Sequence, residues 1–280
     1  MENYSVLTTI YKNDSPEFLR QSIDSMLKQT IITNDYVIVE DGPVTKEIES
    51  VLKEYENKYE FFHIFQLEKN EGLGSALRKG LSLCKNELVA RLDADDISDC
   101  KRCELQLREF EKDSDLAIVG SDMYEFDEDP SIINDLKVMP HTSNEIYKYG
   151  KRRNPFNHSS VMYKKSVIES VGSYSTMRRS QDVELWAKVI YAGYKCLNIN
   201  KPLILFRTDG INRVKRKKKW SNVKSDLKIF KKNYEMGYAS KNDYLYVCLY
   251  QTVFYLLPTK VARYLYIKLF RKNVKRRIQI

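Results

Sequence analysis

The chain has few of the features that mark an exported or disulfide-bonded protein. Its 280 residues include five cysteines, an odd count, and three histidines. No basic start followed by an apolar segment opens the sequence, which predicts no secretory leader. A reduced, cytoplasmic compartment therefore fits better than a disulfide framework. Cys100 and Cys103 form a C-x-x-C motif, but no second pair at metal-binding spacing accompanies them, so we interpret them as two residues of a helix.

Long apolar runs and one familiar glycine motif are also missing. A membrane-spanning helix needs about 20 apolar residues, and the nearest approach, residues 245–257, is interrupted by Gln251 and Thr252. The first strand-like run, residues 5–10, is not followed by G-x-G-x-x-G, which argues against a dinucleotide-binding oxidoreductase. Residues 11–14 contain no glycine, whereas a sugar-phosphate nucleotidyltransferase normally has a glycine-rich, basic loop at that place.

Negative charge is absent from the end of the chain. The formal net charge is +9, and every charged residue after Asp243 is a lysine or an arginine. Such a segment is expected to contact a polyanion: a membrane surface, a nucleic acid or a phosphorylated substrate. The composition as a whole, 42% hydrophobic and 30% charged, is typical of a globular protein.

Strand-like and helix-like segments alternate over the first part of the chain. β-Branched and aromatic runs occupy residues 5–10, 36–39, 61–67, 88–92 and 116–119, and apolar residues at helical spacing occupy 19–27, 48–55, 73–84 and 105–110. This order predicts an α/β fold with a mostly parallel central sheet flanked by helices. Further on, strand-like residues 159–163 and 203–207 bracket a helix at 182–192, and helices are expected after Lys215.

Polar side chains follow three of these strands, at residues 11–14, 40–41 and 93–96. Ligands bind beyond the carboxyl ends of the strands in sheets of this kind. We therefore expect the three segments to share one ligand-binding edge.

Asp93, Ala94 and Asp95 form a D-x-D motif at that edge. Two carboxylates two residues apart can hold Mg²⁺ or Mn²⁺, hard cations that take oxygen ligands and bridge to phosphates. Such an ion offsets the charge that builds on a leaving diphosphate. Taken alone the motif is weak evidence, because acidic residues after a strand more often turn or cap the chain.

The order and spacing of the segments are more specific than any one motif. A strand into Tyr11, a second into Glu40-Asp41-Gly42, Asn70-Glu71-Gly72 opening a helix, and then the D-x-D resemble glycosyltransferase family 2 over residues 4–210. Residues 12–19 and 154–158 look like those of enzymes that build capsular or exopolysaccharide repeat units. The resemblance implies the A-type glycosyltransferase fold, which is Rossmann-like, and an inverting mechanism.

The resemblance also implies a site for a nucleotide-sugar donor. Tyr11 matches an aromatic residue that packs on the donor base, and Glu40 matches the acid that reads the base, usually uracil. Arg78 lies where relatives often have Asn and is a candidate for contact with phosphate. The donor-binding set is Thr9, Tyr11, Glu40, Asp41, Asn70, Gly72, Arg78, Asp93 and Ala94.

The metal-binding set implied for Mn²⁺ or Mg²⁺ is Asp93, Asp95 and Asp209. Asp95 matches the direct metal ligand, and Asp93 the position near ribose and metal. Many relatives have a further histidine ligand after the strand that ends at Arg207. In this sequence either Asp209 takes its place or no third ligand exists.

The catalytic base is expected at the start of a helix. The segment from Gln181 to Trp186 resembles the family's Glu-Asp segment, which assigns deprotonation of the acceptor hydroxyl to Asp182. Gln181 departs from the more usual acid. An aspartate in a first helical turn is also a good cap, so both roles stay open. His158, Gln181 and Trp186 are candidates for the acceptor side, with a structural role as the alternative for His158.

Residues 1–212 form the expected catalytic domain, and residues 213–280 a basic, aromatic helical extension. The extension either lies in a membrane interface among anionic headgroups or packs on the catalytic domain. A membrane position suits an acceptor saccharide carried on a polyprenyl diphosphate. Its apolar stripe consists of Leu256, Leu257, Val261, Leu265, Leu269 and Phe270.

The sequence thus predicts a metal-dependent, inverting hexosyl- or N-acetylhexosaminyl-transferase, peripheral at the cytoplasmic face of the cell membrane. It would move a sugar from a nucleotide diphosphate, UDP before others, to a hydroxyl of a lipid-linked oligosaccharide in surface polysaccharide synthesis. The alternatives are a sugar-phosphate nucleotidyltransferase and a protein that binds nucleic acid or another polyanion through the basic tail. Binding to nucleic acid would fall steeply with salt and survive chelation; we expect no nucleic-acid partner.

Overall fold

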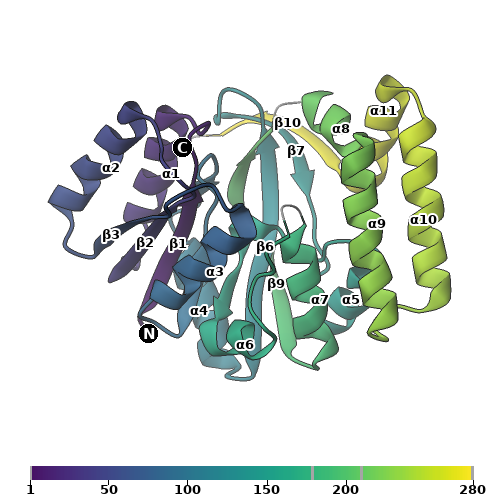
Figure 1. The fold of residues 1–280 in the computed structure, drawn as a ribbon, viewed down its shortest axis with the longest axis horizontal. Helices are drawn as coiled ribbons and strands as arrows, with labels where there is room; N and C mark the ends of the chain where they lie inside the picture. The colour runs from purple at the N-terminus through teal and green to yellow at the C-terminus, as the bar shows by residue number, and fades with distance from the viewer. Residues whose placement is uncertain (1, 178–179, 209–210, 279–280) are drawn as a thin grey trace.

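The computed structural model of the chain describes residues 2–177, 180–208 and 211–278. One ten-stranded sheet runs through the described residues in the order β10-β7-β6-β8-β4-β1-β2-β3, with β9 paired to β5 and β6. Helices flank the sheet, and the C-terminal helices stand on the opposite side of the molecule from β1, β2 and β3 (Figure 1). The α/β fold predicted from the sequence is confirmed.

The first half of the chain forms the parallel part of the sheet. β1 pairs in parallel with β2 and β4, and β2 with β3. All residues of β1, β2 and β4 are buried, as expected of strands covered on both faces. The strands are β1 (Tyr4–Ile10), β2 (Asp35–Glu40), β3 (Phe62–Gln66) and β4 (Leu88–Arg91), and the helices between them are α1 (Pro16–Leu27), α2 (Lys46–Lys58) and α3 (Leu73–Leu83).

Alternate side chains of these strands point to opposite faces of the sheet and build two cores. Val6 and Ile38 belong to the core under α1, α2 and α4 (Arg102–Lys112). Leu7 and Val39 belong to the core under α3, α6 (Lys165–Ser170) and α7 (Gln181–Tyr191). Successive residues at the end of β2 therefore face opposite cores, and only those on the side of Val39 point towards α3.

The sheet becomes mixed beyond β4. β8 runs antiparallel to both β4 and β6, β7 runs antiparallel to β6, and β9 runs parallel to β6. β6, β8 and β9 were predicted at least in part from the sequence. β7 was not predicted, because its residues include Asn, Asp and Lys. The remaining elements here are β5 (Ile97–Ser98), β6 (Leu116–Phe126), β7 (Ile132–Lys137), α5 (Ser143–Gly150), the 3-10 turn η1 (His158–Ser160), β8 (Met162–Lys164) and β9 (Lys195–Arg207).

The C-terminal extension consists of helices that end in a strand. The helices are α8 (Ile211–Lys217), α9 (Trp220–Glu235), α10 (Lys241–Leu256) and α11 (Thr259–Phe270). The helical prediction for this region is confirmed, but the chain then forms β10 (Lys272–Arg277), which pairs antiparallel with β7 and was not predicted. Buried Arg271 donates to both carboxylate oxygens of Glu125 on β6, at 2.8 and 2.7 Å. The basic tail is thus fastened to the sheet, and its lysines and arginines protect an exposed sheet edge.

Gly80 provides a test of how closely α3 packs on β1 and β2. A Cβ at this position would lie 2.4 Å from Leu7 Cδ1 and 2.8 Å from Val39 Cγ2. Replacing an exposed helical glycine by alanine raises the stability of the folded protein by about 1 kcal/mol. Forcing an extra methyl group into a packed core lowers that stability by about 1–3 kcal/mol. We expect Gly80→Ala to lower the free energy of unfolding in urea. Lys79→Ala, on the exposed face, is the control with little effect; a more stable Gly80→Ala variant would contradict the close packing.

Candidate functional site

Two cavities open at the carboxyl ends of β1 and β4. The first cavity, about 400 Å³, is lined by residues that follow β1, β2 and β4 and by the start of α3. The second cavity, about 500 Å³, lies among the end of β4, the start of α7 and the C-terminal helices. Leu73 and Asp93 line both cavities, so the two adjoin. Their sizes are those of sites for small ligands.

Four carboxylates line the first cavity: Asp14, Asp41, Asp93 and Asp95. Partial desolvation within the cavity, reinforced by the negative charge of Asp93, raises the pKa of Asp95 to about 6, although the residue as a whole is exposed. Burial also raises the pKa of Asp14 to about 6. Burial opposes ionisation of Asp93, but the positive charge of Arg91, together with hydrogen bonds from its surroundings, outweighs burial and lowers the pKa of that carboxyl. The cavity therefore holds more negative charge than its own residues neutralise.

The backbone of the D-x-D motif is held by three different elements. Ser22 Oγ on α1 donates to Asp93 O at 3.0 Å, and Asp93 N donates to Ser159 Oγ on η1 at 3.2 Å. Arg207 Nε, at the end of β9, donates to Asp95 O at 3.1 Å. These contacts fix the motif so that its side chains face the cavity.

Asp96, the next residue, has a structural role instead. It is fully buried, accepts a hydrogen bond from Ser159 Oγ, and accepts another from Arg207 N at 3.0 Å. Burial raises its pKa well above the ordinary value. Of the acidic run, Asp93 and Asp95 remain for a ligand.

Arg91 lies beneath the first cavity and joins β1 to β4. It is 1% exposed, and its guanidinium donates to Leu7 O at 3.1 Å, Thr9 Oγ1 at 3.2 Å and Asp93 Oδ1 at 2.5 Å. A buried charge needs such partners. This role of Arg91 was not predicted from the sequence, although an arginine at the end of an apolar strand was a visible signal.

The Asp41 carboxylate organises the start of α3. It accepts hydrogen bonds from Glu71 N at 2.7 Å and Gly72 N at 3.0 Å, a favourable place for an anion. Asn70 Nδ2 donates to Asp41 O at 3.2 Å. Gly42 has φ +84°, and a Cβ there would lie 2.6 Å from Asn70 N, so glycine is required for this close approach.

Most of the predicted donor-binding residues line the first cavity. They are Thr9, Tyr11, Asp41, Asn70, Gly72, Asp93 and Ala94. The structure thus brings together segments that are far apart in the sequence, as the sequence analysis expected. Whether they bind a donor stays a prediction.

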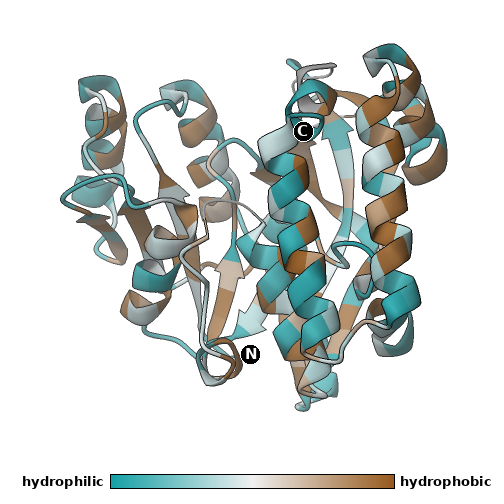
Figure 2. Cartoon of the chain, turned by 45° about the vertical axis from the view of Figure 1, so that its right-hand side comes forward, coloured by the Kyte–Doolittle hydropathy of each residue, from teal (hydrophilic) through white to brown (hydrophobic). Residues whose placement is uncertain are grey.

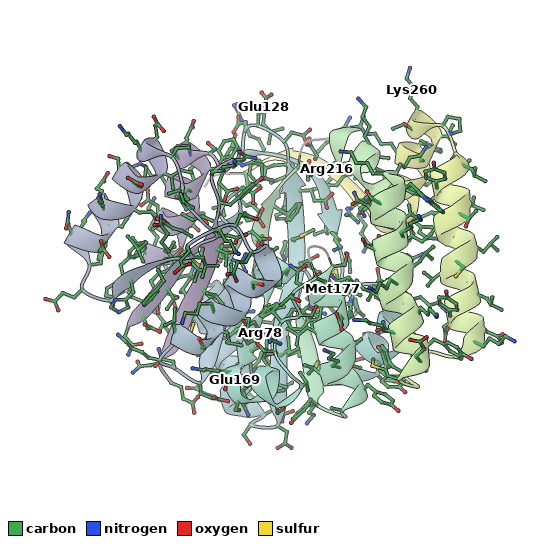
Figure 3. All side chains as sticks on the ribbon, viewed as in Figure 1. Arg78, Glu128, Glu169, Met177, Arg216 and Lys260 are labelled. Carbon is green, nitrogen blue, oxygen red and sulfur yellow. The ribbon has the colours of Figure 1, made fainter. Side chains whose placement is uncertain are left out.

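Glu40 and Arg78 are not among the residues that line either cavity. Glu40 accepts a hydrogen bond from Gln66 Nε2 at 2.6 Å, and burial raises its pKa. Arg78 is exposed on α3 (Figure 3) and donates to Tyr174 O at 2.9 Å and Gly172 O at 2.7 Å, which fastens the loop after α6. The predicted roles of Glu40 and Arg78 in binding the nucleotide-sugar donor therefore stay predictions, which their positions in this structure do not support. Asp209, the predicted third metal ligand, lies outside the described residues.

Asp182 lies in the first turn of α7 and lines the second cavity. Asn154 Nδ2 donates to Asp182 Oδ2 at 2.6 Å, and Asn154 Oδ1 accepts from Phe156 N at 3.2 Å. The helix has no side-chain cap hydrogen bond at its N-cap residue, Ser180. This carboxylate is therefore held by a neighbouring loop, which aims it at the cavity.

His158 and Gln181 also line the second cavity. His158 Nε2 is 3.1 Å from Tyr174 Oη, its Nδ1 is 3.8 Å from Asp93 Oδ1, and burial lowers its pKa. It therefore links the D-x-D to the second cavity as a neutral ring at pH 7. Gln181 is buried, and its Oε1 has no hydrogen-bond partner among the described residues. An unpaired buried oxygen of this kind is uncommon in folded proteins.

Trp186, the third candidate on the acceptor side, lines neither cavity. It is fully buried, with its ring centroid 5.6 Å from that of Phe156 and 6.2 Å from that of His158. Its contact with the site runs through His158, so the acceptor role stays a prediction.

The residues of the first cavity fit a divalent cation held partly by a substrate. Within residues 2–177, 180–208 and 211–278, no three His, Cys, Asp or Glu side chains group closely enough to form a complete metal site. Mg²⁺ is usually held by one or two carboxylates together with substrate phosphates and water. Asp95 suits this arrangement, because its carboxylate has no hydrogen bond or ion pair to another described residue. A cation would also relieve the repulsion that raises its pKa.

A comparison with protein families agrees with this geometry. The family model described as "Glycosyl transferase family 2" matches residues 5–175. The chain belongs to glycosyltransferase family 2. The resemblance deduced from the strand order and the D-x-D is confirmed.

Relatives in this family resemble the chain over nearly its whole length. It is 32% identical over 268 residues to the amylovoran biosynthesis glycosyltransferase AmsE of Erwinia amylovora, covering 95% of this chain and 98% of the relative. It is 36% identical over 269 residues to the UDP-Gal:alpha-D-GlcNAc-diphosphoundecaprenol beta-1,3-galactosyltransferase of Escherichia coli, covering 96% and 97%. These relatives are glycosyltransferases, at least one of them in polysaccharide synthesis.

Solved glycosyltransferases share the fold. The mannosyltransferase PcManGT of Pyrobaculum calidifontis, in complex with GDP-Man and Mn²⁺, has a TM-score of 0.64 at 15% identity and covers 93% of this chain and 72% of its own. S. aureus TarS in complex with UDP-GlcNAc has a TM-score of 0.60 at 14% identity, covering 84% and 73%. The A-type glycosyltransferase fold predicted for this chain is confirmed.

Asp95→Asn tests whether this carboxylate is a metal ligand. A carboxyl whose pKa is raised in the folded state binds protons more tightly there, so it destabilises the metal-free protein increasingly as pH rises from about 4 to 6. In EDTA, we expect Asp95→Asn to raise the melting temperature at pH 7.5, and less at pH 5. We also expect the stabilisation by Mn²⁺ with UDP, present in the unchanged protein, to be lost.

The matched control is Asp115→Asn, an exposed carboxylate outside both cavities. It should change neither the melting temperature in EDTA nor the response to Mn²⁺ with UDP. A full metal response in Asp95→Asn would remove this residue from the metal site.

Proposed function

We propose that the protein is an inverting glycosyltransferase that moves a sugar from a UDP-sugar to a hydroxyl of a lipid-linked saccharide. The observation that carries the proposal is the pair of adjoining cavities. Asp95 is open to a ligand in the first, Asp182 is aimed into the second, and Asp93 and His158 connect them. Transfer between two substrates needs such a junction, because the reacting atoms must meet while each substrate is held.

The donor would occupy the first cavity. Tyr11, 41% exposed, offers a ring for the base, and the loop at Asn70 and Gly72 borders the remaining space. Asp95, with Asp93, would hold Mn²⁺ or Mg²⁺ against the diphosphate. The bound ion supplies charge stabilisation for the leaving nucleotide diphosphate.

The acceptor hydroxyl would meet Asp182 in the second cavity. The Asp182 carboxylate takes the hydroxyl proton while the acceptor oxygen forms a bond to the anomeric carbon and the bond from that carbon to the diphosphate breaks. A single displacement of this kind inverts the anomeric configuration. Asn154 fixes the carboxylate, and positioning of this kind is a large part of base catalysis.

The names of the relatives support these substrate classes. The relative from Escherichia coli is named for a UDP-galactose donor and a GlcNAc-diphosphoundecaprenol acceptor. The one from Erwinia amylovora is named for amylovoran biosynthesis. We infer a hexosyl or N-acetylhexosaminyl donor for this chain, and a role in surface polysaccharide synthesis.

Asp182→Asn tests the base. Removing a general base typically lowers kcat about 10²- to 10⁴-fold, and we expect a loss in this range for transfer from UDP-sugar to a synthetic sugar-diphosphate-lipid. UDP binding with Mn²⁺ should be unchanged, because Asp182 lies outside the first cavity. Anomeric configuration of the product, read by NMR, should be opposite to that of the donor.

Glu169→Gln is the control for this variant, since Glu169 is exposed at α6 and lines neither cavity (Figure 3). It should retain the kcat of the unchanged enzyme. Normal turnover in Asp182→Asn would sink the base assignment, and retained configuration would sink the single displacement.

The outer face of α10 is the proposed membrane contact. Leu245, Leu249 and Leu256 are 53%, 66% and 72% exposed and lie on one side of a helix that is largely apolar (Figure 2). The next helix adds exposed Lys260 (Figure 3) and Arg263. In the described residues, no helix is both long and apolar enough to cross a bilayer. Exposed leucines beside basic residues suit the interface of an anionic membrane.

A variant with Leu249→Ser and Leu256→Ser tests this contact. Each leucine withdrawn from water contributes up to about 1.5–3 kcal/mol, so we expect binding to phosphatidylglycerol-containing vesicles to weaken about tenfold or more in a flotation assay. Ile32→Ser, which changes an equally exposed residue between α1 and β2, should bind as the unchanged protein does. Equal flotation of all three proteins would refute a membrane contact through α10.

A further inference from the structure

Arg153 lies in the wall of the second cavity, enclosed by aromatic rings. Its guanidinium carbon is 3.8 Å from the ring centroid of Phe270, 5.6 Å from that of Tyr250 and 5.9 Å from that of Tyr149. The rings come from α11, α10 and α5. We call these four residues the Arg153 cage. Stacking on ring faces holds the plane of a guanidinium and leaves its edge open to hydrogen bonds.

The guanidinium of Arg153 has no acceptor within the part of the chain that the structure describes. No described residue forms a hydrogen bond or ion pair with it. The neighbouring Arg152, in contrast, donates from Nε to Asp243 Oδ1 at 2.6 Å, and Arg271 bonds both oxygens of Glu125. A planar, fixed fork of N–H donors without a carboxylate fits a bidentate anion such as phosphate.

Arg153 is also coupled in space to the proposed base. It directly precedes Asn154, which holds Asp182 at 2.6 Å. Two hydrogen bonds hold this turn: Arg153 N donates to Tyr149 O at 3.0 Å, and Phe156 N donates to Asn154 Oδ1 at 3.2 Å. An anion on Arg153 and a hydroxyl at Asp182 would therefore belong to one ligand inside one cavity of about 500 Å³.

Other cations share this wall of the second cavity. Arg152 and Lys217 line it as well, the latter with Nζ 3.0 Å from Tyr266 Oη. Several positive charges in one pocket favour a ligand with more than one negative charge. A diphosphate meets this requirement better than a neutral sugar does.

We propose that the Arg153 cage binds the diphosphate of a lipid-diphosphate-linked acceptor, an inference that rests on the proposed function. α10 supports the choice. Its inner residues Val247 and Tyr250 line the cavity, while Leu245 and Leu249 on its outer face are exposed. The same helix thus separates the diphosphate site from the apolar surface that the lipid would meet.

The test compares two acceptors that carry the same sugar, one on a lipid diphosphate and one as an octyl glycoside. We expect Arg153→Gln to raise KM for the diphosphate acceptor about 10- to 100-fold, the effect of losing charge-assisted hydrogen bonds. The kcat/KM for the octyl glycoside and the KM for the UDP-sugar should stay unchanged. Arg153→Lys keeps the charge without the planar fork and should restore binding only in part.

Lys151→Gln is the matched control, because Lys151 is a nearby cation that lines neither cavity. It should behave as the unchanged enzyme does. An unchanged KM for the diphosphate acceptor in Arg153→Gln overturns the proposal. A raised KM for the UDP-sugar instead overturns it too, since Arg153 would then serve the donor diphosphate.

A binding measurement separates this inference from the proposed function. In EDTA, which prevents metal-assisted binding in the first cavity, a short-chain prenyl diphosphate should raise the melting temperature of the unchanged protein and of Lys151→Gln. It should have no effect on Arg153→Gln. Absence of transfer to every acceptor would reject the proposed function, whereas equal stabilisation of all three proteins would reject the diphosphate site.

Discussion

The buried guanidinium of Arg91 is the contact on which the arrangement of the site depends. It bonds Leu7 O and Thr9 Oγ1 on β1 and the Asp93 carboxylate after β4. One side chain thus fixes two strand ends and supplies the positive charge that keeps Asp93 ionised. Asp95 receives no such partner among the described residues. The imbalance leaves a negative cavity that suits a cation.

Charge is divided between the two cavities. The first is lined by four carboxylates and one arginine, whereas the second combines Asp93, Asp182 and Asp226 with several arginines and lysines and with aromatic rings. A glycosyltransferase that joins two phosphorylated substrates must bind one diphosphate beside its metal and keep the other away from it. Aromatic rings from α5, α10 and α11, with Arg152 and Arg153 directly after α5, would provide a place for an anion away from the proposed cation. The C-terminal helices are therefore part of the site in this account.

The parts that the sequence predicted are those encoded locally. β1, β2 and β4 are short runs rich in β-branched and apolar residues. Ser15 before Pro16 marks the start of α1, where it accepts a hydrogen bond from Phe18 N. The contact between Asn154 and Asp182 spans 28 residues, and no local pattern reports it. β10 was missed for the same reason, since its pairing depends on distant β7. The orientation of Glu40 could have been predicted from the sequence. Alternation along a strand places Glu40 on the same face as Ile38, towards α2 and away from the cavity.

The most direct test of the account is a crystal structure of the protein with UDP and Mn²⁺. The account predicts the base beside Tyr11 in the first cavity and the ion between the Asp95 carboxylate and the diphosphate, with the second cavity left to the acceptor. A nucleotide bound in the second cavity, or an ion without contact to Asp95, would contradict it.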